Sequence, residues 1–190
     1  MSLKRSILAL GIGLVALCTA VAQAADNYKV DPVHSTIVFR IKHVNISWFY
    51  GRFTGPEGTV VDDAADPTKT SFDVQVKVAN VDTANPKRDD HLKSPDFFSA
   101  KEFPTIAFKS TSVKKAGDKL EVSGDLTIHG QTKPITVTLE RVGAADTKMG
   151  SRVGYAGEFT IKRSDFGMSK FLEMLGDDVM IRVGLEAVKQ

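Results

Sequence analysis

The chain alternates apolar and polar residues over most of its length, and this period of two is typical of β-strands rather than helices. In 119–129, even positions such as Leu120, Val122 and Leu126 are apolar, whereas the odd positions are polar or charged. A strand with one apolar and one polar face fits an antiparallel sheet that has water on one side. Similar alternation, less regular in the first half of the chain, occurs in 35–43, 52–62, 70–79, 104–113, 134–141, 152–163 and 178–188.

Eight strand-like runs with few helical signals between them predict an all-β fold. An eight-stranded antiparallel barrel would leave an interior wide enough for one small ligand, although a sandwich fits the same alternation. Turn residues separate the runs at Gly117-Asp118, at Gly130-Gln131 and across 143–151. Short helical segments are expected only in the loops, at 44–50, 85–99 and 168–176.

The first 24 residues have the pattern of a cleaved signal peptide. Lys4 and Arg5 precede the apolar stretch 7–17, which is short for a membrane span, and the Ala-Gln-Ala sequence at 22–24 matches a cleavage site. We therefore expect residues 25–190 to form a single domain of a periplasmic or secreted protein. A retained membrane anchor is the alternative.

The expected cleavage also changes what the composition implies. The only cysteine, Cys18, lies within 1–24, so the mature chain would have neither a disulfide nor a thiol nucleophile. Leu17 before it is not small, and lipidation is therefore not expected. Of the 25 Lys and Arg, all but Lys4 and Arg5 remain, and they balance the 23 Asp and Glu. Without excess positive charge, nucleic acid is not an expected partner.

The sequence contains no recognisable metal-binding or nucleophile motif. The spacing of His34, His43, His91 and His129 lacks the short pairs that are common among metal ligands. The sequence also has neither a G-x-S-x-G elbow nor a phosphate-binding loop. We therefore expect no metal ion and no cofactor.

The segment 80–108 places polar groups beside aromatic ones. Asn85-Pro86 has the form of a helix start, because an N-cap acceptor is followed by proline at the first helical position. Arg88 and His91 then share one helix face and offer hydrogen-bond donors to a phosphate or carbonyl oxygen. Phe97 and Phe98 follow after Ser94-Pro95. The alternative is that Arg88 only pairs with a nearby carboxylate, which would be Asp82, Asp89 or Asp90.

The same segment resembles the signature of the YceI-like lipid- or polyisoprenoid-binding family. The resemblance extends in order over nearly all of 26–188, with further matching segments at 43–53 (HVNISWFYGRF), 124–134 (GDLTIHGQTKP) and 159–167 (FTIKRSDFG). It implies a lipocalin-like barrel in an exported protein that holds an isoprenoid or fatty chain, often as a homodimer.

Under this interpretation the candidate site residues fall into two groups. Arg88, His91 and Arg163 would bind the head group, and Arg163, at an inward position after Ile161, would need either Asp165 or the ligand as partner. The remaining residues would line the tail cavity or close its mouth, although alternation alone does not separate ligand contact from core packing. They are Phe39, Ile41, Trp48, Phe49, Tyr50, Val74, Val76, Phe97, Phe98, Phe108, Leu126, Val137, Tyr155, Phe159, Phe171, Met174 and Val183.

These observations lead to one main hypothesis and two alternatives. The main hypothesis is a non-catalytic exported carrier or buffer for an isoprenoid or fatty lipid, which would make transient contact with a membrane or membrane protein. The first alternative is an enzyme that acts on a lipid head group with His91 as general base. The second is a protein-interaction module whose barrel is filled by side chains.

Overall fold

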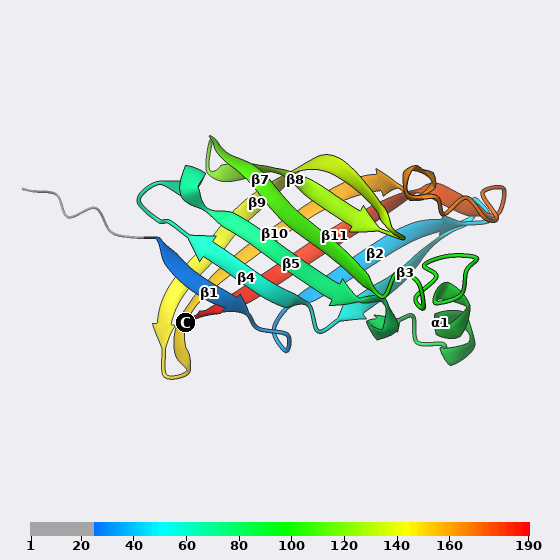
Figure 1. Cartoon of the computed structure of the whole chain (residues 1–190), viewed down its shortest axis with the longest axis horizontal. Coiled ribbons are helices and arrows are strands. Elements are labelled where there is room, and N and C mark those ends of the chain that lie inside the picture. Colours follow the sequence, from blue (N-terminus) through cyan, green and yellow to red (C-terminus); the bar gives the residue numbers. More distant parts are fainter. Residues whose placement is uncertain (1–24) are drawn as a thin grey trace, which may run out of the picture.

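The computed structural model describes residues 25–190, which form one antiparallel sheet that closes into a barrel (Figure 1). The predicted signal peptide and Cys18 lie outside the described residues. The elements are β1 (Asp26–Val30), β2 (Thr36–His43), β3 (Ser47–Thr54), β4 (Glu57–Asp62), η1 (Pro67–Lys69), β5 (Ser71–Lys77), η2 (Val78–Asn80), β6 (Val81–Asp82), α1 (Pro86–Leu92), β7 (Thr105–Ala116), β8 (Lys119–Ile128), β9 (Gln131–Thr147), β10 (Gly150–Lys162), η3 (Arg163–Phe166) and β11 (Leu175–Lys189).

The barrel is an eight-stranded meander in which three long strands are interrupted. A ring of pairings runs β1-β4-β5-β7-β8-β9-β10-β11 and closes between β11 and β1. β2 continues β1 along β11, β3 continues β4 along β2, and β6 continues β5 along β3. This confirms the predicted eight-stranded antiparallel barrel and excludes the sandwich.

Proline and glycine explain two of the interruptions. Pro32 lies between β1 and β2, where its missing N–H cannot join the ladder. Gly55-Pro56 separates β3 from β4, and the φ of +63° at Gly55 belongs to the left-handed region that glycine adopts without strain. The strands therefore bend around the barrel without losing their order in the sheet.

The connecting segments differ in part from the sequence prediction. In 85–99 only α1 is α-helical; the Asn85 side chain caps it by accepting from the Arg88 N–H at 3.2 Å. The prediction of helix at 44–50 is wrong, because a tight turn at Val44 and Asn45 leads directly into β3. The segment 168–176 is also not helical but forms turns before β11. The turn expected across 143–151 is much shorter, since β9 runs to Thr147 and β10 begins at Gly150.

The end of the barrel away from α1 is filled by a packed core. Tyr28, Val60, Val122 and Val153 belong to this cluster and are almost fully buried. Tyr155 belongs to it as well, with its ring edge-on to Phe72 at 5.0 Å between centroids. Its placement in the cavity wall was therefore wrong: it points inward but lies in the filled end.

A buried polar group holds Tyr155 in this core. The Tyr155 hydroxyl donates to the Asp62 carboxylate, and Arg141 donates to both oxygens of Asp62 at 2.9 and 2.8 Å. Burial raises the pKa of the Tyr155 hydroxyl, and the hydrogen bond to Asp62 adds to this effect. Burial also pushes the pKa of Asp62 upward, but the hydrogen bonds from Arg141 and Tyr155 outweigh it and hold that pKa below its ordinary value.

This network predicts an acid-sensitive contribution to stability. Because the folded pKa of Asp62 is lowered, its carboxylate stabilises the fold above about pH 4, the pKa of an unfolded aspartate. That contribution is lost as the pH falls through the folded pKa. We expect Asp62→Asn to be less stable than the wild type at pH 7 and the difference in free energy of unfolding to shrink below about pH 4. Urea denaturation at several pH values measures this, and a pH-independent difference would contradict it.

Within residues 25–190, no helix has the length and apolar character needed to cross a bilayer.

Candidate functional site

The half of the barrel nearer α1 contains an apolar cavity of about 640 Å³. Its wall comes from the inward faces of the strands, and its mouth is bordered by α1, by the β2–β3 turn and by the segment 168–175. Inward side chains such as Ile106, Ile135 and Ile181 are only partly buried, although they point to the barrel axis. Side chains therefore do not fill this half of the barrel.

Two glycines help to keep the cavity open. A Cβ at Gly51 would lie 2.3 Å from the ring of Phe39, its partner across β2 and β3. A Cβ at Gly124 would lie 2.6 Å from the ring of Phe108. Both phenylalanine rings thus lie over a position without a side chain, close to the wall.

All but two of the predicted tail residues lie in the cavity wall or at its mouth. Their contact with a ligand stays a prediction. The residues in place are Phe39, Ile41, Trp48, Phe49, Val74, Val76, Phe97, Phe98, Phe108, Leu126, Val137, Phe159, Phe171, Met174 and Val183.

The two exceptions are Tyr155, described above, and Tyr50. Tyr50 belongs to β3, in which successive side chains point to opposite faces. Phe49 points inward opposite Ile41, so Tyr50 points outward opposite Arg40 and is 54% exposed. The expected helix at 44–50 had obscured this alternation.

Further residues of the wall were missed in the sequence, although the same alternation marks most of them. Ile135 lies two positions before Val137, and Ile181 two before Val183, on strands that had been recognised. Others of this kind are Ile37, Phe72, Ile106, Ile128, Leu139, Ile161, Val179 and Leu185.

Arg88 lies in the cavity wall, but its partners are not the expected ones. Its Nε donates to Thr83 Oγ1 at 2.9 Å and its Nη2 to the Thr83 carbonyl at 2.7 Å. The three carboxylates of the alternative have other partners: Asp89 accepts from Thr83, Asp82 pairs with Arg52, and Asp90 pairs with Lys93. The guanidinium also lies over the Phe49 ring, 4.2 Å from its centroid. Both hydrogen-bond partners of Arg88 are thus neutral groups of Thr83, and the Asp89 carboxylate is linked to it only through the Thr83 hydroxyl.

His91 lies near Arg88 at the mouth of the cavity. Its Nε2 is 3.0 Å from Asp96 Oδ2, and its ring meets Phe97 edge-on at 5.0 Å between centroids. The Phe171 ring lies 6.2 Å away, so α1 contacts the segment 168–175 through this histidine. Arg88 and His91 thus bring polar atoms to the mouth of a cavity whose wall is mainly apolar.

Arg163 borders the cavity, but its hydrogen bonds go to backbone groups of the protein itself. It is almost fully buried and donates to the carbonyl oxygens of four residues at 2.6 to 3.0 Å, which are Met168, Lys170, Leu175 and Gly176. Burial lowers the pKa of its guanidinium, and the negative charges of Asp177 and Glu173 oppose that shift. Asp165 is therefore not its partner. With four N–H groups engaged, Arg163 has one left for a head group.

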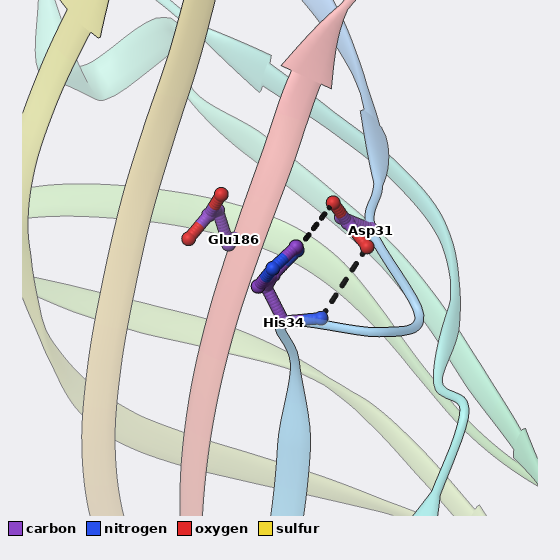
Figure 2. Close-up of side chains that lie close together, drawn as sticks. All are labelled: Asp31, His34 and Glu186. Carbon is purple, nitrogen blue, oxygen red and sulfur yellow. Dashed lines mark hydrogen bonds and ion pairs between the residues drawn. The ribbon is translucent and has the colours of Figure 1, made fainter. Parts of the chain in front are cut away.

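A cluster of ionisable side chains lies where β1 gives way to β2. His34 Nδ1 is 2.8 Å from Asp31 Oδ2, and Glu186 lies beside them on β11 (Figure 2). Arg152 Nη1 donates to Asp31 at 2.8 Å and to Glu186. Hydrogen bonds from His34 and Arg152 hold the pKa of Asp31 well below its usual range. Because a guanidinium already bridges the two carboxylates, we interpret the cluster as an ion-pair network that fixes the strand break.

Comparison with known sequences gives matches over almost the whole chain. A family model described as the YceI-like domain matches residues 28–187. The UPF0312 protein of Pseudomonas aeruginosa strain LESB58 is 37% identical, covering 99% of this chain and 100% of that protein. The protein YceI of Escherichia coli O157:H7 gives the same identity and coverage.

Solved structures share the barrel. The crystal structure of Burkholderia cenocepacia BcnA has a TM-score of 0.75 at 27% identity, covering 84% of this chain and 99% of that one. The Campylobacter jejuni YceI protein has a TM-score of 0.70 at 34% identity, covering 78% and 89%. A polyisoprenoid-binding domain from Saccharophagus degradans has a TM-score of 0.64, covering 86% and 98%, and its 14% identity shows a shared fold only.

Proposed function

The chain belongs to the YceI-like domain family, and on this premise we propose that it is a non-catalytic exported carrier or buffer that holds one long isoprenoid or fatty chain inside its barrel. The observation that carries the proposal is the apolar cavity of about 640 Å³. This volume is within the range of roughly 300–1,000 Å³ that is typical of ligand pockets. The cavity also argues against the alternative of an interaction module with a filled barrel.

The energetics of such binding are adequate without many polar contacts. Burial of two or three isoprene units supplies on the order of 10 kcal/mol, at about 0.8 kcal/mol for each methylene-like group. Association and ordering remove about half of this or more. Micromolar affinity needs about 8 kcal/mol net, so a longer chain, or a few contacts at the mouth, would reach it.

The chemical class of the ligand is supported by the lining and by one structural relative. The wall is formed mainly by aliphatic and phenylalanine side chains, which suit a branched hydrocarbon as well as a fatty chain. The domain from Saccharophagus degradans is described as polyisoprenoid-binding and has the same barrel. We therefore place the isoprenoid first and the fatty chain second.

Arg88 and His91 are proposed to face the ligand's head group at the mouth. We expect Arg88→Met to weaken binding of a prenyl phosphate by about tenfold to a hundredfold, because a charge-assisted hydrogen bond contributes roughly 1.5–3 kcal/mol. Binding of the prenyl alcohol with the same chain should change much less. Lys87→Met on the exposed side of α1 is the matched control. Isothermal titration with both ligands measures this, and equal losses for phosphate and alcohol would contradict the assignment.

The contact between His91 and Asp96 keeps the enzymatic alternative open to test. A histidine held by a carboxylate at the edge of a cavity has the arrangement of a general base. Under the carrier hypothesis, prenyl phosphate incubated with the wild-type protein is recovered unchanged, and His91→Ala affects binding only. Wild-type turnover that disappears in His91→Ala while lipid binding persists would establish the enzyme instead.

Native mass spectrometry of gently purified protein tests the proposal as a whole. We expect a bound apolar molecule in the purified protein, or uptake of one prenyl chain for each protein chain after addition. Repeated absence of both would overturn the proposal. The same spectra test two further expectations. An intact mass that matches residues 25–190 would support export, because it would show that the expected signal peptide has been removed. A doubled mass would support the homodimer.

A further inference from the structure

Apolar side chains gather at the mouth of the cavity on its outer side. Ile46 in the β2–β3 turn is 84% exposed and Trp48 is 49% exposed. Leu172 and Met174, in the segment before β11, are 40% and 49% exposed. We call these four residues the mouth rim. Exposed large apolar residues that lie together around an opening are a feature of surfaces that contact a partner.

The two segments that carry the mouth rim are held together. The Val44 N–H donates to the Met174 carbonyl at 2.6 Å, and Leu175 pairs with His43 across β11 and β2. The buried Arg163 guanidinium also holds the segment before β11 in place, because it donates to the carbonyl oxygens of Lys170 and Leu175. The β2–β3 turn and the segment before β11 therefore lie side by side at the same end of the barrel and hold each other in place.

Cationic side chains surround the aromatic part of this surface. The Arg40 guanidinium lies 4.3 Å from the centroid of Trp48, and the Lys42 ammonium lies 5.9 Å from it. The Lys170 ammonium lies 5.6 Å from the centroid of Phe171 and 3.9 Å from Asp96. Exposed Glu173 is the acidic residue within the segment. Tryptophan beside lysine and arginine is the combination that favours the boundary between lipid head groups and acyl chains.

We propose that the mouth rim docks on a lipid bilayer that contains anionic lipids, with Ile46 and Leu172 inserted among the acyl chains. The proposal rests on the proposed function, because a hydrocarbon chain can then pass between bilayer and cavity without crossing water. A second copy of the chain fits this surface less well. In a two-fold contact the same patch would face itself and bring Arg40 and Lys42 close to their equivalents.

Vesicle binding by the purified protein tests the proposal. The probes are vesicles of phosphatidylcholine with and without phosphatidylglycerol, and the readout is co-sedimentation. Trp48 is the only tryptophan of the chain, so its emission reports insertion as a second signal. We expect binding to vesicles that contain phosphatidylglycerol, weakened by salt.

The variant Ile46→Asp/Leu172→Asp should weaken vesicle binding by about a hundredfold, roughly tenfold for each side chain that no longer inserts. Neither residue belongs to the cavity wall. Met149→Asp is the matched control, because Met149 is 67% exposed in the β9–β10 hairpin, which lies at the other end of the barrel from α1 (Figure 1). It should bind vesicles as the wild type does.

Binding of farnesol to the same proteins in solution, without vesicles, separates this proposal from the proposed function. Retained farnesol binding with lost vesicle binding in the double variant supports docking by the mouth rim. Wild-type protein that binds farnesol but not vesicles overturns the docking proposal alone. Equal vesicle binding by wild type and double variant also overturns it. So does a wild-type dimer that the double variant converts to a monomer without any vesicle binding, since the rim would then join two copies.

Discussion

Replacement of Ile181 by tryptophan is expected to lower the affinity for the ligand more than tenfold while the barrel stays folded. Ile181 points from β11 into the cavity and is only partly buried there. A larger side chain at this position therefore enters empty space. It would take up room for about one isoprene unit, whose loss costs roughly 2 kcal/mol or more after ordering costs, which is more than tenfold in affinity. Titration of delipidated protein with a prenyl alcohol measures the effect.

The matched control is Arg182→Trp on the same strand. Arg182 points to the outer face and pairs with Glu158, and exposed pairs of this kind contribute little to stability. It should bind the prenyl alcohol as the wild type does. Ile181→Ala should also still bind, because it widens the cavity. Full affinity in Ile181→Trp, with a folded protein by circular dichroism, would show that the ligand does not occupy this cavity.

Replacement of Arg163 by alanine is expected to cause the largest loss of stability among the site residues. Four carbonyl oxygens of the segment 168–176 would lose a charged donor that is shielded from water. A buried acceptor that loses its donor costs roughly 1–3 kcal/mol, so the four carbonyls together should cost at least about 3 kcal/mol even if water reaches some of them. Urea denaturation should therefore show a reduction of this size in the free energy of unfolding.

Arg163→Lys distinguishes the geometry of the donor from its charge. Lysine retains the charge, but a single ammonium cannot reach four carbonyls that surround a planar guanidinium. We expect it to recover less than half of the lost stability. A free energy of unfolding within about 0.5 kcal/mol of wild type for Arg163→Ala, the usual limit for surface positions, would contradict the structural role.

Much of the fold follows from local patterns in the sequence. Alternation depends only on the two faces of a strand, so it located part of each of the eight barrel strands and most of the cavity wall, including Phe39, Val137 and Val183. It missed β1 and the first half of β3, which lie outside the predicted runs. The N-cap at Asn85 is equally local, and α1 begins as predicted. These features need no knowledge of distant residues.

The parts that were missed depend on partners far away in the sequence. Tyr155 has the inward parity of a cavity residue, but its partner Asp62 lies 93 positions away and places it in the filled end. Arg163 donates to four backbone carbonyls, most of them in turns between η3 and β11. The pattern of side chains in the sequence does not predict such contacts with the backbone. Tyr50 was misplaced because aromatic residues in 44–50 were interpreted as helical, whereas β3 already begins at Ser47.

The most direct test of the central claim is the dependence of affinity on chain length. Delipidated protein is titrated with prenyl alcohols of two, three and four isoprene units, which share one head group. If the apolar cavity holds the chain, each added unit should raise the affinity by about tenfold or more until the cavity is full. Affinity that does not change with chain length, or no binding of any of the three, would contradict the account.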